Sequence, residues 1–248
     1  MDLTNNTILI TGGSSGIGLE LSRQLVAKNK VIICGRSEKA LLKAQAELPK
    51  LVVYPCDLSD ENQCDQMVKW IQKEHPTLNV LINNAAIVHK EPFLQTANIT
   101  EKAEQEMRTN FLAPIRLIHL LYPMLQQNEQ ASIINVTTGL IYTPRADYPF
   151  YNATKAALHS FTQVLRKQTE ASNVEVIEVM FPAVKTPWHK GSPPKIAISC
   201  EEAVTKMIKG LVKGKSEIRV GGAKLLYVIS RVAPGFAFKK VNEITNEK

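Results

Sequence analysis

One short stretch near the N-terminus constrains the fold more than any other part of the chain. Thr7–Ile10 is an apolar run of the kind found in buried parallel strands. It leads into the glycine-rich turn Thr11–Gly18, which is followed by a helical pattern of apolar residues. Glycines let the backbone turn sharply and approach a pyrophosphate, whose charge then lies at the helix N-terminus. This order predicts a nucleotide-binding α/β domain; a merely flexible turn is the alternative.

The spacing of the turn is T-G-x-x-x-G-x-G, one residue longer between its first two glycines than the common dinucleotide fingerprint. Backbone groups of this turn are the expected contacts of the phosphates. The residues that we assign to this role are Gly12, Ser14, Ser15, Gly16, Ile17 and Gly18.

A second strand-like run, Val31–Cys34, ends in Gly35 and Arg36. NAD-selective folds usually carry an acidic residue here for the ribose 2′-hydroxyl, whereas an arginine accommodates a 2′-phosphate. Arg36 therefore predicts NADP as cofactor, with NADPH preferred over NADH. The alternative is a plain surface arginine before a helix that Ser37 caps.

Further apolar runs alternate with helical patterns along the rest of the chain, and we detect no repeat, linker or low-complexity stretch. This alternation predicts a single α/β domain over residues 1–248, with a doubly wound parallel sheet of the Rossmann type between two helical layers. The expected strands are 51–54, 80–82, 132–136, 174–180 and 217–220.

Tyr151 and Lys155 stand four positions apart in a helical pattern, so their side chains share one helix face. A tyrosine hydroxyl has an unperturbed pKa of about 10 and is a poor acid or base at neutral pH. A cation beside it favours the phenolate and lowers that pKa toward the working range. An ordinary helix with an exposed lysine is the alternative for this pair alone.

Together these motifs resemble the short-chain dehydrogenase/reductase family, in its compact branch of about 250 residues. The glycine turn matches, Asp57-Leu58 matches the family's D-h dipeptide, and Asn83–Ala86 matches N-N-A-G except that Ala86 replaces the glycine. The resemblance implies cofactor contacts from Asp57, Leu58, Asn84 and Ala85. From the residues alone, Asp57 can accept a hydrogen bond from adenine or cap a turn.

The resemblance also implies a catalytic set. Tyr151 exchanges a proton with the substrate oxygen, and Lys155 holds it near its productive pKa and binds the nicotinamide ribose. Asn110 bends its helix and holds a water that leads to the lysine. The family places a serine thirteen residues before the tyrosine, and Thr138 occupies that position here. Thr138 is therefore expected to orient the substrate, with Thr137 as the neighbouring alternative.

The sixth strand ends in Phe181-Pro182-Ala183-Val184-Lys185-Thr186, where the family usually has P-G followed by a threonine. The resemblance implies that Pro182, Val184 and Thr186 contact the nicotinamide; a loop threonine is the alternative for Thr186. Residues 186–200 are expected to form a substrate loop. The stretch P-A-V-x-T-P-W and the apolar tail also resemble the oxidoreductases encoded beside teichoic-acid D-alanylation genes.

The C-terminal tail, residues 223–248, is apolar from Leu225 to Phe238 with flanking basic residues, and Pro234-Gly235 argues against one continuous helix. Packing over the pocket or a subunit interface is favoured over contact with an anionic membrane surface. The family resemblance implies a homodimer or homotetramer, paired through the helices that carry Asn110 and Tyr151.

The net charge of +7 suits an anionic ligand, but the lysines are scattered and no nucleic-acid motif accompanies them. The four cysteines show no metal-ligand spacing, and no apolar run approaches the ~20 residues of a membrane span. We therefore expect a cytoplasmic protein without a metal or a nucleic-acid partner. The family resemblance implies that it is an oxidoreductase, which transfers a hydride between NADP(H) and a carbonyl/alcohol substrate. The alternative is a catalytically silent NADP-binding sensor or assembly partner.

Overall fold

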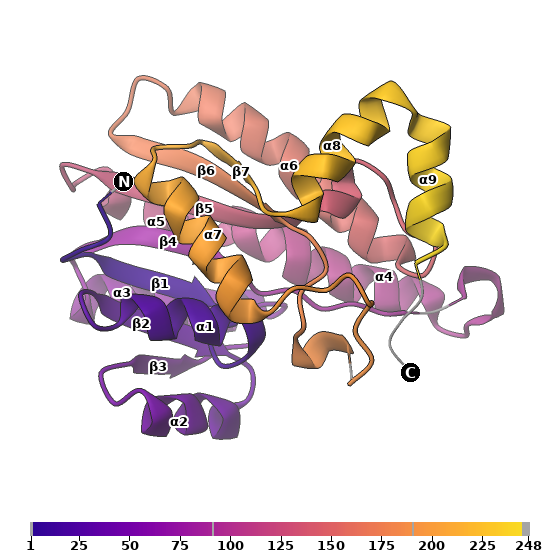
Figure 1. Cartoon of the computed structure of the whole chain (residues 1–248). Coiled ribbons are helices and arrows are strands. Elements are labelled where there is room, and N and C mark those ends of the chain that lie inside the picture. Colours follow the sequence, from indigo (N-terminus) through magenta and orange to yellow (C-terminus); the bar gives the residue numbers. More distant parts are fainter. Residues whose placement is uncertain (1, 91, 190, 245–248) are drawn as a thin grey trace.

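Seven parallel strands in the order β3-β2-β1-β4-β5-β6-β7 form the centre of the structure (Figure 1). The structure is a computed structural model that describes residues 2–90, 92–189 and 191–244. The strands are β1 (Thr7–Thr11), β2 (Lys30–Gly35), β3 (Val52–Pro55), β4 (Leu78–Asn83), β5 (Ala131–Thr138), β6 (Val174–Phe181) and β7 (Glu217–Arg219). All seven strands expected from the sequence are present.

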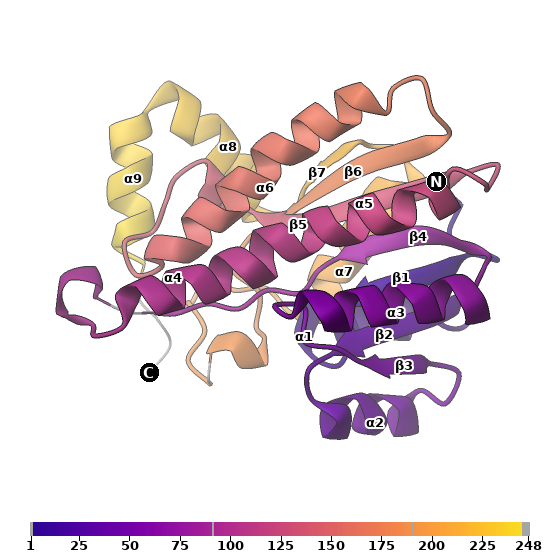
Figure 2. The same ribbon diagram turned by 180° about the vertical axis from the view of Figure 1, so that it is seen from behind.

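Helices cover both faces of the sheet, as the doubly wound prediction requires. Because side chains alternate along a strand, Ile8 and Ile10 of β1 pack against one layer and Leu9 packs against the other. One layer contains α1 (Gly16–Leu25), α2 (Glu38–Glu47) and α7 (Cys200–Val212). The other contains α3 (Glu61–Glu74), α5 (Ala113–Leu125) and α6 (Pro149–Gln168) (Figure 2).

The strand order reverses between β1 and β4, because the chain first builds β2 and β3 on one side of β1 and then crosses to the other. In open α/β sheets, ligands bind at the carboxyl ends of the strands beside such a switch point. The Thr11 hydroxyl fixes this point, since it accepts hydrogen bonds from the backbone N–H groups of Asn84 (2.9 Å) and Ala85 (3.0 Å). The fold therefore places the binding crevice where the glycine turn begins.

The helix that carries Asn110 is interrupted. It consists of α4 (Ile99–Met107), the π-helical turn η2 (Arg108–Leu112) and α5. π-helical turns inside α-helices often mark functional sites. This one carries Asn110, in agreement with the expected local bend.

The chain ends in two short helices, α8 (Gly222–Val232) and α9 (Pro234–Asn242), which meet at Ala233. The break at Pro234 confirms that the tail is not one continuous helix. The loop after β6 carries the short 3₁₀ turn η4 (Pro187–His189). Residue 190 of the predicted substrate loop, residues 245–248 of the predicted tail and residue 1 of the predicted domain lie outside the described residues.

Helix starts follow local capping chemistry. Ser199 caps α7, with its hydroxyl accepting from the Glu202 N–H at 3.0 Å. Asp60 caps α3, because its carboxylate accepts from the N–H groups of Asn62 and Gln63. No helix in the described ranges combines the length and apolar character that crossing a bilayer needs.

Candidate active site

A cavity of about 820 Å³ runs along the carboxyl ends of the strands, from the glycine turn to α8 and α9. All the residues that the sequence assigned to the cofactor line this cavity. They are Gly12, Ser14, Ser15, Gly16, Ile17, Gly18, Arg36, Asp57, Leu58, Asn84, Ala85, Tyr151, Lys155, Pro182, Val184 and Thr186.

The glycine turn leaves room that other residues would fill. Gly16 has a φ of +53°, which L side chains rarely adopt. A Cβ on Gly18 would lie 2.2 Å from the carbonyl oxygen of Gly12, so this close approach of helix and turn requires glycine. Among the described residues no side chain caps α1 at Ser15, and its first turn carries no acidic residue. The free N–H groups of this helix N-terminus suit a pyrophosphate.

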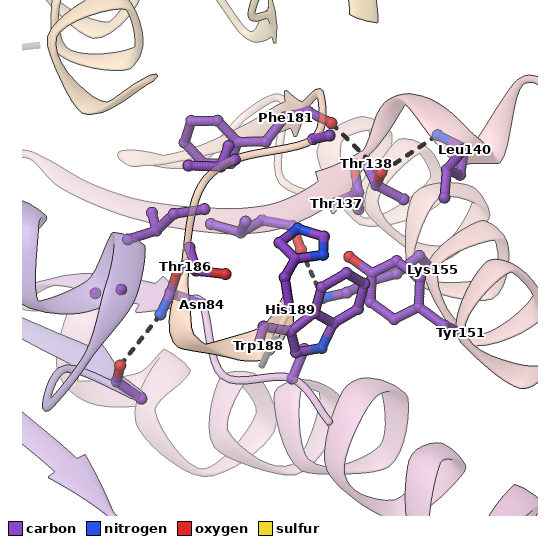
Figure 3. A pocket seen from close by; sticks show the side chains of 18 of the residues that line it. Asn84, Thr137, Thr138, Leu140, Tyr151, Lys155, Phe181, Thr186, Trp188 and His189 are labelled. Carbon is purple, nitrogen blue, oxygen red and sulfur yellow. Dashed lines mark hydrogen bonds between the residues drawn. The ribbon is translucent and has the colours of Figure 1, made fainter. Parts of the chain in front are cut away.

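Asn84 joins the end of β4 to the glycine turn. Its side-chain amide donates to the carbonyl oxygens of Thr11 (2.9 Å) and Gly12 (3.4 Å). Gly16 in turn packs close to Thr186, since a Cβ on Gly16 would lie 3.2 Å from the threonine methyl group. Segments that are distant in the sequence thus form one continuous wall around the phosphate end of the cavity (Figure 3).

Arg36 lies at the end of β2, is exposed to solvent and lines the cavity. Asp57 lines the same end, but its Oδ1 already accepts hydrogen bonds from the N–H (2.9 Å) and hydroxyl (2.8 Å) of Ser59. The turn-capping interpretation of Asp57 therefore applies, and its place on the cavity wall keeps the adenine contact available. The glycine turn, the open helix end and Arg36 together fit a nicotinamide dinucleotide.

Tyr151 projects from α6 into the middle of the cavity, close to Thr138 at the end of β5 (Figure 3). The Tyr151 ring centroid lies 5.3 Å from that of Trp188 on the loop after β6. Burial raises the pKa of the Tyr151 hydroxyl, and a hydrogen bond with the Thr138 side chain lowers it in part. The sequence interpretation expected a lowered pKa; here desolvation outweighs the favourable contacts.

Lys155 lies one helical turn beyond Tyr151 and is buried. Its ammonium group donates to the carbonyl oxygen of Val136 at 2.8 Å. Burial lowers the pKa of Lys155 to about 8, and the negative charge of Glu178 opposes this effect. The pKa of this buried ammonium group therefore lies closer to neutral pH than that of an exposed lysine.

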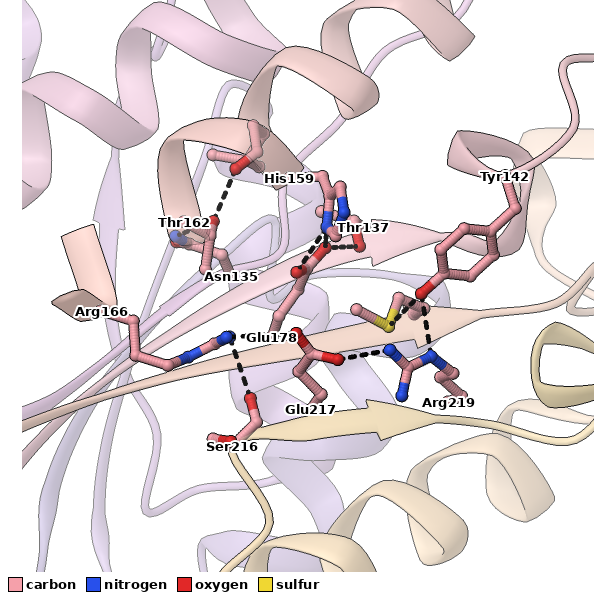
Figure 4. Close-up of polar contacts among 12 residues, drawn as sticks. Asn135, Thr137, Tyr142, His159, Thr162, Arg166, Glu178, Ser216, Glu217 and Arg219 are labelled. Atoms are coloured by element: carbon pink, nitrogen blue, oxygen red, sulfur yellow. Dashed lines mark hydrogen bonds and ion pairs between the residues drawn. The ribbon is translucent and has the colours of Figure 1, made fainter. Parts of the chain in front are cut away.

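The buried Glu178 and Thr137 form a polar cluster with the partly exposed His159 (Figure 4). The Thr137 hydroxyl donates to Glu178 Oε1 at 2.6 Å, and His159 Nδ1 lies 2.8 Å from Glu178 Oε2. Strand alternation thus directs the Thr137 hydroxyl to this cluster, while that of Thr138 lies near Tyr151. Both threonines line the cavity, and the Thr138 hydroxyl also donates to the Phe181 carbonyl at 3.4 Å.

The sequence model of the family described as short chain dehydrogenase matches residues 6–196. The chain belongs to the short-chain dehydrogenase family. It is 45% identical over 224 residues to the uncharacterized oxidoreductase DltE of Bacillus subtilis, covering 88% of this chain and 89% of that protein. This likeness confirms the narrower resemblance found in the sequence. A fatty acyl-CoA reductase of Mycobacterium tuberculosis is 32% identical over 193 residues, covering 75% of this chain and 66% of the relative.

Solved structures of short-chain dehydrogenases share the fold. One from Burkholderia cenocepacia in complex with NADP has a TM-score of 0.85 at 24% identity, covering 97% of this chain and 99% of that one. A second from Burkholderia phymatum, in complex with NAD, has a TM-score of 0.84 at 16% identity and covers 100% and 99% of the two chains. These likenesses confirm the Rossmann-type architecture.

Asn110 lies behind the cavity wall of this short-chain dehydrogenase and is not among the described residues that line it. Its side-chain carbonyl accepts from the Ile87 N–H (2.8 Å), and its amide donates to the Ile87 carbonyl (2.9 Å) and the Thr154 hydroxyl (3.2 Å). Asn110 thus connects the loop after β4 to α6, where its partner Thr154 directly precedes Lys155.

Sequence reasoning missed Glu106, which is fully buried one helical turn before Asn110. Its Oε1 accepts from the His89 N–H at 2.5 Å and lies 3.1 Å from His89 Nδ1. Burial raises the pKa of Glu106 to about 7, while the His89 N–H lowers it in part. Glu106 and Asn110 are four positions apart in a helical pattern, and this spacing could have indicated that both side chains lie on one helix face. In the structure that face contacts Ile87 and His89.

Proposed function

We propose that this short-chain dehydrogenase is an NADP(H)-dependent oxidoreductase that interconverts a carbonyl and an alcohol. The observation that carries the proposal is the convergence of Tyr151, Lys155 and Thr138 on the cavity that also contains the glycine turn and Arg36. Relatives named fatty acyl-CoA reductase and ketoacyl reductase support carbonyl chemistry. Related structures in complex with NADP and NADPH support the cofactor, although another contains NAD.

In this proposal the glycine turn and the N-terminus of α1 bind the pyrophosphate, and Arg36 pairs with the 2′-phosphate. Asp57 and Leu58 contact the adenine end; Asn84, Ala85, Pro182, Val184 and Thr186 lie toward the nicotinamide end. A bound nicotinamide supplies a hydride to the carbonyl carbon in reduction and accepts one in oxidation. The protein positions the substrate, excludes water and handles the proton.

Tyr151 donates its phenolic proton to the carbonyl oxygen, whose C=O electron pair becomes the new O–H bond as the carbon receives the hydride. Thr138 donates a hydrogen bond that orients the same oxygen. Lys155 returns a proton to Tyr151 and binds the nicotinamide ribose. We propose that Asn110, at the opened backbone of η2, holds a water that connects Lys155 to solvent.

Tyr151→Phe tests this assignment with the least change in shape. NADPH binding, followed by NADPH fluorescence, should be retained, while NADPH oxidation with an active aldehyde should fall by about 10²–10⁴-fold. Tyr148→Phe is the matched control, because it removes a neighbouring hydroxyl from the same cavity, and it should lose far less activity. Unchanged turnover in Tyr151→Phe would refute the assignment.

The second candidate is an NADP-binding sensor or assembly partner without turnover. The raised pKa of Tyr151 favours it, as do Thr138 in the serine position and the alanines at 86 and 183. Wild-type protein incubated with NADPH and a panel of aldehydes and ketones separates the two candidates. Binding of NADPH without its oxidation on any compound supports the sensor.

We further propose a homodimer or homotetramer that pairs through the helices carrying Asn110 and Tyr151, since Leu112 and Val164 are exposed on these helices. The loop of residues 186–200 and the tail from residue 223 enclose the substrate. Cys34, Cys56, Cys64 and Cys200 are free thiols, which supports a reducing, cytoplasmic setting.

A further inference from the structure

We propose that the end of the cavity formed by α8, the end of α9 and the loop after β6 binds an unbranched aliphatic chain of the substrate. The inference rests on the proposed function, because the chain would extend from the carbonyl beside Tyr151. It adds the substrate class: a carbonyl compound with a long alkyl chain.

Helix α8 begins directly beside the reacting groups. Gly139 follows Thr138, and a Cβ on Gly139 would lie 3.2 Å from both the Cα and the Cβ of Ala223 and 3.6 Å from Leu226 Cδ2. The inner face of α8 therefore packs on the backbone next to the substrate-orienting hydroxyl. An alkyl chain attached to a carbonyl at this point would therefore contact α8 directly.

The residues that α8 and the end of α9 contribute to this end are aliphatic. Ala223, Leu226 and Ile229 recur at three-residue intervals on α8 and line the cavity. Val241 of α9 and Ile244 line it as well. A polar substrate such as a sugar would leave hydroxyl groups without partners against these walls, which costs binding energy.

The mouth of the cavity is flanked by two large aliphatic residues that remain exposed. Leu225 on α8 is 63% exposed, and Ile196 on the facing loop is 60% exposed, yet both line the cavity. Exposed apolar residues gathered at a pocket mark an apolar ligand. The aliphatic surface thus continues from the reacting groups to solvent, as a linear chain requires.

The far wall is fixed in place by hydrogen bonds. The Ala146 N–H donates to Asn242 Oδ1 at 2.7 Å, and Arg145 Nη2 donates to the Ile244 carbonyl at 2.9 Å. Arg145 also forms an ion pair with Asp147 at 3.0 Å. The Arg145 guanidinium is therefore already paired with the tail and with Asp147. It does not need an anionic group of the substrate as a partner.

The first experiment measures kcat/KM with NADPH for butanal, hexanal, octanal and decanal. Burial of each methylene should raise kcat/KM by about fourfold until the subsite is filled. Ile229→Phe, which fills the subsite, should flatten this dependence. Val228→Phe is the matched control on the same helix, because Val228 is 50% exposed and is not among the described residues lining the cavity; it should keep the wild-type profile.

The second experiment measures binding without turnover. Trp188 lies in the cavity, so its fluorescence should respond to decan-1-ol more than to butan-1-ol, and Ile229→Phe should weaken the response to decan-1-ol. Trp70, the second of the two tryptophans, packs against Tyr54 at 4.7 Å and gives a constant background.

The two readouts separate the possible failures. Turnover with equal kcat/KM from butanal to decanal would overturn the aliphatic subsite and leave the proposed function intact. Binding of decan-1-ol that Ile229→Phe weakens, without NADPH oxidation on any aldehyde, would support the subsite and count against the proposed function. If Ile229→Phe and Val228→Phe flatten the dependence of kcat/KM on chain length equally, the subsite would also be overturned.

Discussion

In the proposed function, the preference for NADPH over NADH rests on Arg36. It is exposed at the end of β2, on the wall of the cavity, where a 2′-phosphate would lie in the proposed complex. Arg36→Asp should raise KM for NADPH by about tenfold to a hundredfold, since it removes a charge-assisted contact and adds repulsion, and should change KM for NADH much less. Lys39→Asp, an equal charge change nearby on α2, is the control. Equal changes for NADPH and NADH would contradict the assignment.

Glu106 makes stability depend on pH in a calculable direction. Its pKa is raised to about 7 by burial, so the folded protein binds this proton more tightly than the unfolded chain does. The resulting stabilisation is fully present below the unfolded pKa of about 4.3 and is lost as the pH rises to about 7. Above that pH the folded protein holds a buried carboxylate whose Oε2 has no hydrogen-bond partner among the described residues.

Glu106→Gln removes this titration while keeping the shape and the oxygen that accepts from His89. Its free energy of unfolding relative to wild type should therefore rise by about 2–3 kcal/mol between pH 5 and pH 8. Urea unfolding at both pH values measures this change. Glu104→Gln, at an exposed position on the same helix, should show no comparable rise. A constant difference for Glu106→Gln would refute the shifted pKa.

At the scale of elements, the sequence was informative wherever the signal was local. Apolar runs such as Val31–Cys34 indicate strands, and the glycines of Thr11–Gly18 indicate a tight turn between a strand and a helix. The partners of buried polar groups were not predictable, because they depend on contacts between distant segments. His159 with Glu178 and His89 with Glu106 are such pairs. The apolar composition of the tail left packing over the pocket and a subunit interface open, and in the structure the inner face of α8 lines the cavity.

The attachment of α9 to the rest of the protein is one such non-local feature, and it can be tested. The Asn242 side chain accepts from the Ala146 N–H at 2.7 Å and donates to the Pro144 carbonyl at 3.2 Å. Asn242→Ala removes both hydrogen bonds, each worth about 1 kcal/mol, so local opening of α9 should become about thirtyfold more frequent. Amide hydrogen exchange over residues 234–242 measures this. Lys239→Ala should leave exchange unchanged; equal effects would show that these bonds do not hold the helix.

At the scale of the whole molecule, no element among the described residues covers one broad helical face. Figure 2 shows α5 and α6 side by side on this face, and Val164 on α6 is 53% exposed. If two copies pair here, light scattering after gel filtration should give at least twice the mass of the chain. Val164→Glu should reduce this mass to that of a monomer, because an unpaired charge is costly in an apolar interface. Val212→Glu, on α7 of the opposite helical layer and 61% exposed, should not. A monomeric wild-type protein, or an oligomer unaffected by Val164→Glu, would exclude pairing through this face.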